Sequence, residues 1–455
     1  MKNPEIKYVS EGPSSYYIAL AAWRRGLNVT FIKNINNYRI TSPEKSLFFC
    51  NSAVMSGRNG LLTYHICKDK NKTKQLLQKN KIKIPAGKLF EHSSVKSEII
   101  SYAERLGYPV VLKSNNESGG ANVFPHLKNK SQVNRALESV KANRDDFKIL
   151  VEKHIEGEDY RVFVLGEEVI AAYKRIPANV IGDGERSIKS LIIDKNNQRK
   201  KNQYFEGKLL EVDSEVILNL QNQKLTVDSI LPEGKMVYLQ KKANLGSGGD
   251  ATDVTDELPE HLKQLAVKAI QSIPDLNNGG VDILYSEGKP AEATVLEINY
   301  MAQIGGHLFP SVGSYRDVGA KMIDFYFPES IKAQSRNSEM FFNMKTIEKY
   351  FEAFPESDFT LAPSPVNETI RRTVVMHGDF KFPDIKYKIR NEARRLNLSG
   401  FIKKQNFEEI EIVLSGEEED IGLFAEFLEN GNHGIKSFEM RKYHKPIVMG
   451  FYIDS

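Results

Sequence analysis

Two apolar runs near residue 290 constrain this chain more than any other feature. Residues 279–284 and 295–299 are rich in β-branched and aliphatic side chains and are joined by a polar turn, which predicts a hairpin. Side chains alternate along a strand, so Glu297 and Asn299 face one side, and Asp282 joins them if the hairpin closes. Acids between apolar neighbours are costly unless they have a partner or a task. We therefore favour three converging oxygen donors, suited to Mg²⁺ shared with substrate phosphates, over a solvated surface hairpin.

Composition limits the class of protein. A chain of 455 residues has room for two to four domains, and its net charge of +4 requires neither nucleic acid nor a membrane as a partner. No apolar run approaches the length of a membrane span, and the first residues are too polar for a signal peptide. The two cysteines, Cys50 and Cys67, favour a reducing compartment, although a disulfide between them stays open. A cytoplasmic enzyme or binding protein is expected.

The pattern of elements divides the chain into four parts. We expect an N-terminal α/β domain over 1–88, alternating strands and helices over 89–330, a polar linker over 331–368 and a compact domain over 369–455. In the last part the predicted order is βαββαβ: a strand at 372–376, a helix at 386–396, strands at 400–404 and 409–414, a helix at 420–429 and a strand at 437–442. The fold class is therefore α/β and α+β.

Several cations stand beside loops of small residues. Lys113 ends an apolar strand and precedes a loop rich in Gly, Ser and Asn, as suits a phosphate, although an exposed turn is at least as good a reading of that segment alone. The bend within 149–161 can wrap an adenine edge or form a charged loop. Lys241 precedes the small-residue loop 246–249, a composition that suits an anionic ligand.

Two longer segments, 157–188 with Asn196–Arg199 after it, and 237–256, carry a family resemblance. In this order they resemble an ATP-grasp carboxylate–amine ligase, most of all the module in cyanophycin synthetase and in the bifunctional glutathione synthase. The resemblance spans roughly residues 65–330. It implies the ATP-grasp fold, with an N-terminal pre-grasp domain and two α+β subdomains.

The resemblance also implies roles for single residues. Those implied for ATP are Lys70, with Lys74 as its substitute, Lys113, Glu117, Ser118, Gly119, Gly120, Glu152, Lys153, Ile155 and Asp159. Asp282, Glu297 and Asn299 match the magnesium ligands. Arg161, Arg175 and Lys241 are candidates for neutralising the transferring phosphoryl group, and Ser247, Gly248, Gly249 and His307 fall where the family meets its carboxylate substrate.

The implied reaction uses ATP with Mg²⁺, or Mn²⁺ as an alternative, to convert a carboxylate into an acyl phosphate that an amine then attacks. Its partners would be small carboxylates and amines, such as amino acids or peptides, and a homo-oligomer stays open. Tyr300–His307 follows the metal-binding Asn where the family has Pro-Gly, and Ser114 stands where Pro is usual. These departures concern substrate identity more than reaction class.

Residues 374–431 resemble acylphosphatase, and that enzyme has the ferredoxin-like βαββαβ fold. The phosphate-binding arginine and the water-orienting asparagine of that enzyme are replaced by Lys386 and Lys404. Lysine lacks the planar fork of arginine and the carbonyl of an amide, so we expect this domain to be non-catalytic. The alternatives kept open are an acyl-phosphate hydrolase centred on this domain and a non-catalytic nucleotide-binding regulator.

Overall fold

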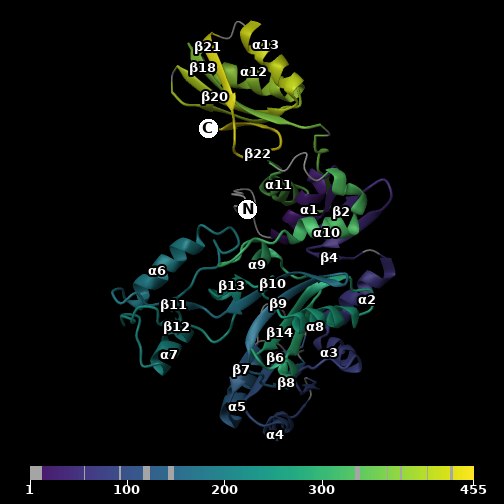
Figure 1. The fold of residues 1–455 in the computed structure, drawn as a ribbon, viewed down its shortest axis with the longest axis vertical. Coiled ribbons are helices and arrows are strands. Elements are labelled where there is room, and N and C mark those ends of the chain that lie inside the picture. The colour runs from purple at the N-terminus through teal and green to yellow at the C-terminus, as the bar shows by residue number, and fades with distance from the viewer. Residues whose placement is uncertain are drawn as a thin grey trace. The chain divides into compact units, whose positions relative to one another are not determined.

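The computed structural model describes residues 13–55, 57–91, 94–115, 123–141, 148–333, 339–365, 367–379, 382–406, 408–430 and 434–454. They fall into two compact units (Figure 1). One unit runs from Phe49 to Lys321, and the other contains residues 13–48 and 322–454. In the described part of the chain, no helix is long and apolar enough to cross a membrane.

The unit from Phe49 to Lys321 is organised by an antiparallel sheet. Its strands, in order across the sheet, are β13 (Asp250–Asp253), β10 (Glu168–Ile176), β9 (Glu158–Leu165), β14 (Asn278–Tyr285) and β15 (Thr294–Asn299). Tyr160, Val162 and Val164 of β9 face one side and pack with helix α8 (Glu260–Gln271) in an apolar core. The intervening residues face the other side of the sheet, and among them are the charged side chains expected to bind ligand.

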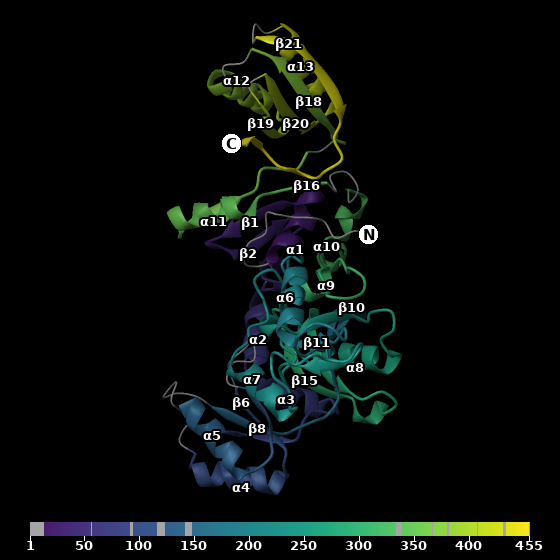
Figure 2. The ribbon, with the colours of Figure 1, turned by 90° about the vertical axis from the view of Figure 1, so that its left-hand side faces the viewer.

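A second sheet in this unit has the order β5 (Gly87–Phe90), β8 (Ile149–Lys153), β6 (Val110–Ser114) and β7 (Val123–Leu127), so that β7 is its last strand. Helices α4 (Lys96–Leu106) and α5 (Lys130–Lys141) lie together beside it (Figure 2). Apolar residues of both helices and of all four strands form its core.

Shorter elements complete the unit. Helix α2 (Gly57–Lys68) precedes α3 (Lys70–Lys79), whose first turn is capped by the Asp69 carboxylate. The other elements are β4 (Ala53–Val54), β11 (Asn179–Ile181), α6 (Ile188–Arg199), α7 (Ser214–Asn222), β12 (Met236–Tyr238), η1 (Leu245–Ser247), η2 (Pro290–Glu292) and α9 (Gly305–Leu308). The polar composition of residues 194–207 predicts a mobile or substrate-facing segment, and the structure shows these residues as the end of α6 and the turn after it.

The second unit begins with α1 (Pro13–Arg24), β1 (Asn28–Ile32) and β2 (Asn34–Thr41), followed by β3 (Ser46–Cys50). The sequence pattern predicts a strand at 6–10, a helix at 14–25 and a strand at 28–32. The helix and the second strand are present, whereas residues 6–10 lie outside the described residues. Residues 331–368, expected as a linker, include β16 (Met340–Phe341), α11 (Met344–Ala353) and β17 (Asp358–Thr360), after α10 (Val318–Tyr326) and η3 (Pro328–Ala333). Strand β17 pairs with β1. The domain boundaries stay predictions.

The C-terminal part has the predicted βαββαβ order. It consists of β18 (Ile370–Gly378), α12 (Phe382–Arg395), β19 (Ser399–Lys404), β20 (Glu409–Gly416), α13 (Glu418–Asn430) and β21 (Ile435–Lys442). The sheet order β21-β18-β20-β19 is ferredoxin-like, and both helices pack on one face of it (Figure 1). The sequence did not predict β22 (Ile447–Val448), which pairs with β16, or β23 (Phe451–Asp454), which adds a parallel strand beside β19.

Helix α13 offers a matched test of this packing. Phe424 is fully buried in the core of the C-terminal domain, and its neighbour Leu423 is 42% exposed. We expect Phe424→Ala to lower the unfolding free energy of the domain by about 3–5 kcal/mol, because it leaves a cavity. Leu423→Ala should stay within about 0.5 kcal/mol of the parent. Urea denaturation of the full chain, followed by circular dichroism, measures both, and equal effects would contradict this packing.

Candidate active site

Three lysines and two acids from separate elements form one part of the site. The Glu152 carboxylate of β8 contacts the Lys74 ammonium of α3, and its second oxygen lies 2.8 Å from Lys113 Nζ of β6. All three side chains are buried. Lys70, at the first position of α3, lies with its Nζ 3.6 Å from Oε1 of Glu297 on β15. Lysines expected at a nucleotide site thus converge on one carboxylate and on a predicted metal ligand.

Crowding of cations alters the protonation of this cluster. Burial, reinforced by the charges of Lys113 and Lys70, lowers the pKa of Lys74 to about 6. Burial likewise lowers the pKa of Lys113 to about 8, with the charge of Lys70 acting in the same direction. The charge of Glu297 acts against both pKa shifts, and the Glu152 carboxylate contacts both amines. The cluster is therefore poised to take up protons when a polyanion arrives.

A second group lies in a row across the central sheet. Arg161 of β9 stands opposite Asp282 of β14, and Asp282 stands opposite Glu297 of β15. Arg161 Nε lies 2.7 Å from Asp282 Oδ1, and Arg175 Nη2 lies 3.1 Å from Asp282 Oδ2. The same Arg175 atom lies 2.6 Å from Oδ1 of Asp159, the acid expected at the ribose. Asp282, only 6% exposed, is thus neutralised by two guanidinium groups.

These contacts set the ionisation of the row. Burial opposes the charged form of Arg175, yet the charges of Asp282 and Asp159 raise its pKa above the ordinary value. Burial raises the pKa of Asp159, while Arg175 acts in the opposite direction. Arg175 remains protonated throughout the physiological range and can serve as a fixed positive charge.

Local backbone features make room for this row. A Cβ on Gly280 of β14 would come within 2.7 Å of Arg161 Nη1, so the space beside Asp282 depends on the absence of a side chain there. On β15, Glu297 pairs with Asp282 whereas Val295 pairs with Ile283, which leaves Leu296 as an extra residue in a bulge. Bulges re-aim neighbouring side chains, and this one lies directly before Glu297.

The donor set fits a hard divalent cation. The structure brings Asp282 and Glu297 opposite each other, and Asn299 Nδ2 donates to Asp282 Oδ2 at 3.3 Å. Two carboxylates and one amide oxygen are the ligand types that Mg²⁺ takes when water and substrate phosphates supply the rest. Among the described residues no cluster of three or more His, Cys, Asp or Glu could hold a metal, so the candidate set here consists of two carboxylates and the Asn299 amide.

The small-residue turn at Ser247, Gly248 and Gly249 is held by a buried arginine of α6. Arg199 Nη1 donates to the carbonyl oxygens of Gly248 at 3.3 Å and Gly249 at 3.0 Å, and Nη2 donates to the Leu245 carbonyl at 3.2 Å. Gly248 has a φ of 100°, a conformation that favours glycine. Arg199 therefore fixes the shape of the turn expected to meet the carboxylate substrate.

An ionic network supports the same turn. Asp250 Oδ2 lies 2.5 Å from Lys195 Nζ, its Oδ1 lies 3.2 Å from Arg199 Nη1, and Asn179 Nδ2 donates to Oδ2 at 3.0 Å. Asp250 starts β13 and pairs with Ile176 of β10. The turn is thus attached to the strand that carries Arg175.

His307 lies in α9 and is 2% exposed. Its ring packs 4.5 Å from the Tyr173 ring of β10 and 6.0 Å from that of Phe163, centroid to centroid. Among the described residues, neither of its ring nitrogens has a hydrogen-bond partner. Burial, reinforced by the charge of Arg161, lowers the pKa of His307 to about 3, so the imidazole is neutral at physiological pH.

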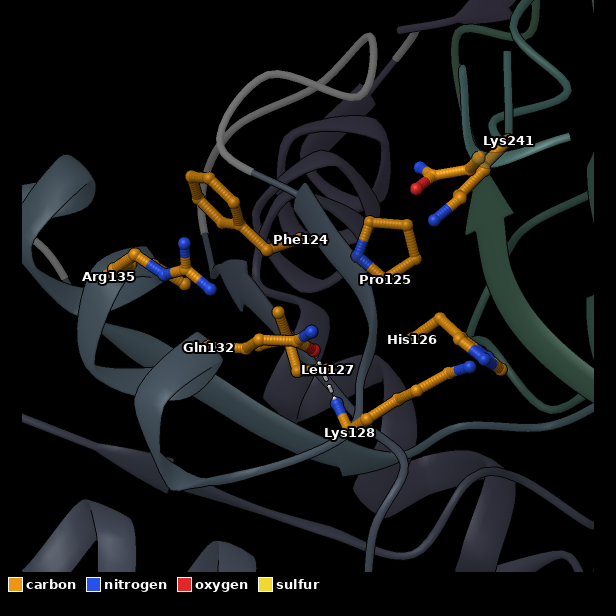
Figure 3. A pocket seen from close by; sticks show the side chains of 10 residues that line it. Phe124, Pro125, His126, Leu127, Lys128, Gln132, Arg135 and Lys241 are labelled. Atoms are coloured by element: carbon orange, nitrogen blue, oxygen red, sulfur yellow. Dashed lines mark hydrogen bonds between the residues drawn. The ribbon is translucent and has the colours of Figure 1, made fainter. Parts of the chain in front are cut away.

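Other predicted residues lie apart from these groups. The Lys153 ammonium donates to the carbonyls of Gly107 at 2.8 Å and Tyr108 at 3.1 Å, so its side chain is already engaged. Ile155 is half-buried in the segment after β8. Lys241 is exposed and lines a cavity with residues of β7 and α5 (Figure 3). Glu117, Ser118, Gly119 and Gly120 lie outside the described residues.

Sequence reasoning missed several residues of the site. Lys195, Asp250 and Asn179 were not singled out, and Arg199 entered only as part of a motif. Tyr173 packs on His307 and was quoted without a role. The Asn-x-x-Arg motif is the sequence signal that could have pointed to Arg199. Its other member, Asn196, also has a structural role, since its side-chain amide makes two hydrogen bonds to the Leu210 backbone.

Comparisons with known proteins match both the central and the C-terminal parts of the chain. The RimK-like ATP-grasp domain family matches residues 67–184, and the acylphosphatase family matches residues 386–453. The glutathione biosynthesis bifunctional protein of Pasteurella multocida is 34% identical over 295 residues, which are 60% of this chain and 38% of that protein. Cyanophycin synthetase of Synechocystis is 31% identical over 284 residues, 61% of this chain and 32% of that protein.

A solved structure gives the same result. The crystal structure of the bifunctional glutathione synthetase from Pasteurella multocida superimposes with a TM-score of 0.50 and 27% identity, covering 69% of this chain and 44% of that one. The matched part of the chain covers 41% of the glutathione biosynthesis bifunctional protein of Clostridium perfringens, and it covers less than half of the other relatives named here. The chain joins an ATP-grasp module, related to those of bifunctional glutathione synthetase and cyanophycin synthetase, to a C-terminal acylphosphatase-like domain.

Proposed function

We propose that the protein is an ATP-dependent carboxylate–amine ligase that forms an amide bond through an acyl phosphate. The observation that carries this proposal is one charged cluster in the unit from Phe49 to Lys321. Five cations (Lys70, Lys74, Lys113, Arg161 and Arg175) face four carboxylates (Glu152, Asp159, Asp282 and Glu297). A surplus of cations around a metal-competent carboxylate pair suits a triphosphate.

The first step joins the carboxylate to the γ-phosphoryl group. A carboxylate oxygen attacks the γ-phosphorus, the bond to the β–γ bridging oxygen breaks, and ADP leaves with that electron pair. In this proposal Arg161 and Arg175 neutralise the charge on the transferring group, and Lys113 and Lys74 hold the nucleotide phosphates, as their positions beside Asp282 and Glu152 support. Asp282, Glu297 and Asn299 would hold Mg²⁺, or Mn²⁺ in its place, which would add Lewis-acid stabilisation of the phosphates.

In the second step the neutral amine attacks the acyl carbon, and the tetrahedral adduct collapses with cleavage of the C–O bond to phosphate. Inorganic phosphate leaves with that electron pair and takes up the proton that the nitrogen loses. The turn at Ser247–Gly249 is the proposed contact of the carboxylate substrate, and Arg199 fixes its shape. His307 is neutral and lacks a hydrogen-bond partner among described residues, so it can accept or donate one hydrogen bond to substrate.

The substrates that we propose are amino acids or peptides, since the matched relatives are named for glutathione biosynthesis and cyanophycin synthesis. Asp159 is proposed at the ribose, and the segment containing Glu152, Lys153 and Ile155 at the adenine. The side chains of Glu152 and Lys153 are engaged elsewhere, so the adenine would be met by backbone groups. The two cysteines are free thiols, in keeping with the proposed cytoplasmic setting.

The first prediction tests the metal-competent pair. Purified protein with ATP, Mg²⁺ and pooled amino acids should release ADP in a substrate-dependent manner. Asp282→Asn with Glu297→Gln should lower that rate at least about a hundredfold, because the two proposed carboxylate ligands of the Mg²⁺ that would neutralise the phosphates are lost. The control is Glu287→Gln with Glu292→Gln, two exposed acids of the same hairpin, which should leave the rate unchanged. ADP release that survives in the first variant would refute the proposal.

A second prediction concerns protons. At pH 8 Lys74 is largely neutral and Lys113 is half protonated, from pKa values of about 6 and 8, and bound phosphates favour the protonated amines. Binding of AMP-PNP with Mg²⁺ should therefore take up as much as about 1.5 protons at pH 8, about one at Lys74 and about half of one at Lys113, and affinity should fall as pH rises from 7 to 9. Calorimetry in two buffers of different ionisation enthalpy measures the uptake.

The matched variant is Lys113→Arg, whose guanidinium stays protonated at pH 8. It should reduce the proton uptake while preserving nucleotide binding. Equal uptake in the parent and in Lys113→Arg would show that Lys113 is not a source of the effect.

The C-terminal domain is proposed to be a non-catalytic member of the acylphosphatase family, with Lys386 on α12 and Lys404 at the end of β19. We expect the full chain, with Asp282→Asn to silence the ligase site, to hydrolyse benzoyl phosphate no faster than buffer does. A rate above the spontaneous one would favour the alternative, an acyl-phosphate hydrolase. Nucleotide binding without any turnover in either assay would favour a regulator.

A further inference from the structure

A second, more open site lies beside the edge strand β7. A cavity of about 670 Å³ is lined by residues of β7 and α5 and by two residues from other parts of the same unit, Asn222 and Lys241 (Figure 3). The lining also includes Phe124, His126, Lys128 and Arg135. This volume lies within the range of small-molecule and peptide sites. In Figure 3, Lys241 reaches toward Pro125 from the side opposite Arg135.

The charge of the cavity has one sign. Lys128, Arg135 and Lys241 are exposed cations, His126 adds a further base, and none of the described residues that line the cavity is a carboxylate. Within the described residues, no acid lies within ion-pair distance of these three cations. Like charges around one cavity repel each other and raise the local concentration of anions. The cavity therefore suits a ligand with several negative charges.

The shape of the lining favours an extended ligand with apolar stems. Strand β7 is the last strand of its sheet, so one edge of its backbone is not paired in that sheet, and Pro125 is a residue tolerated at such an edge. Phe124, Leu127 and Ala136 add apolar surface between the cations. Inorganic phosphate is compact and has no apolar groups to pack against this surface, whereas the methylene groups of glutamate-like side chains can pack against it.

Chain connectivity relates the cavity to the proposed substrate turn. Lys241 stands four positions before Leu245, where the turn that Arg199 holds begins. Lys241 thus belongs both to the cavity lining and to the loop segment that leads into the turn. Lys241 would contact the part of the substrate that joins the two places.

We propose that this cavity is a subsite for the acidic part of the substrate, an amino acid or short peptide that carries several carboxylates. The inference rests on the proposed ligase function, since it names the substrate class of that site. Carboxylates would pair with Lys128 and Arg135, and the stems would lie on the apolar lining.

The test is direct binding to the full chain. Fluorescein-labelled tetraglutamate should bind at low ionic strength by fluorescence anisotropy, and labelled tetraglutamine should not. Lys128→Glu with Arg135→Glu should weaken tetraglutamate binding about tenfold or more, as expected for two reversed ion pairs. The control Lys189→Glu with Lys268→Glu changes net charge equally at exposed lysines outside the lining and should leave the affinity unchanged.

Three outcomes would overturn the inference: absence of tetraglutamate binding, equal weakening in both double variants, or displacement of the peptide by inorganic phosphate at equal ionic strength, which would assign the cavity to phosphate anions. AMP-PNP binding with Mg²⁺, measured on the same samples, separates the two proposals. If nucleotide binds and tetraglutamate fails these criteria, only the subsite is refuted, whereas loss of nucleotide binding refutes the ligase proposal.

Discussion

The charge of Asp282 is the constraint on which the site depends. The carboxylate is buried in the middle of a five-stranded sheet and is compensated by Arg161 on the adjacent strand and by Arg175 one strand further. Breaking a buried pair of this kind typically costs about 3–5 kcal/mol, because the remaining charge is left without a partner. The contact between Arg161 and Asp282 requires that residue 280 has no side chain, and the pairing of β14 with β15 places Glu297 opposite Asp282. Positions on three strands are thereby fixed by one carboxylate.

The parts of the fold that depend on local pattern were predictable from sequence. Alternation along 279–299 predicted the hairpin, and the C-terminal βαββαβ order followed from short strands and periodic helices. Contacts between residues distant in sequence were not predictable. No local signal pairs β17 with β1 across more than three hundred residues, or directs Arg199 toward the carbonyls of a turn about fifty residues later. The Lys153 ammonium illustrates the same limit, since a family position alone does not reveal which carbonyls it contacts.

Two kinds of positive charge therefore coexist in the unit from Phe49 to Lys321. Lys74 and Lys113 are buried against a single carboxylate, so burial penalises their charged forms and a bound polyanion would relieve that penalty. Lys128 and Arg135 are exposed and are already fully solvated. A polyanion that contacts Lys74 and Lys113 gains more binding free energy per contact, because the dielectric constant around buried charges is low. A polyanion that contacts the exposed Lys128 and Arg135 gains little from each contact and needs several contacts at once.

Because of this difference, binding at the two sites should depend differently on salt concentration. Exposed charges are screened within a Debye length of about 8 Å at physiological ionic strength, whereas partly buried pairs are screened much less. An acidic substrate held at the cavity would thus be released readily, while the nucleotide stays bound through its buried contacts. On the proposed function, this difference would benefit a ligase that exchanges its carboxylate substrate and product. The buried contacts would act where the phosphoryl group is transferred, and the exposed contacts would hold the remainder of the substrate weakly.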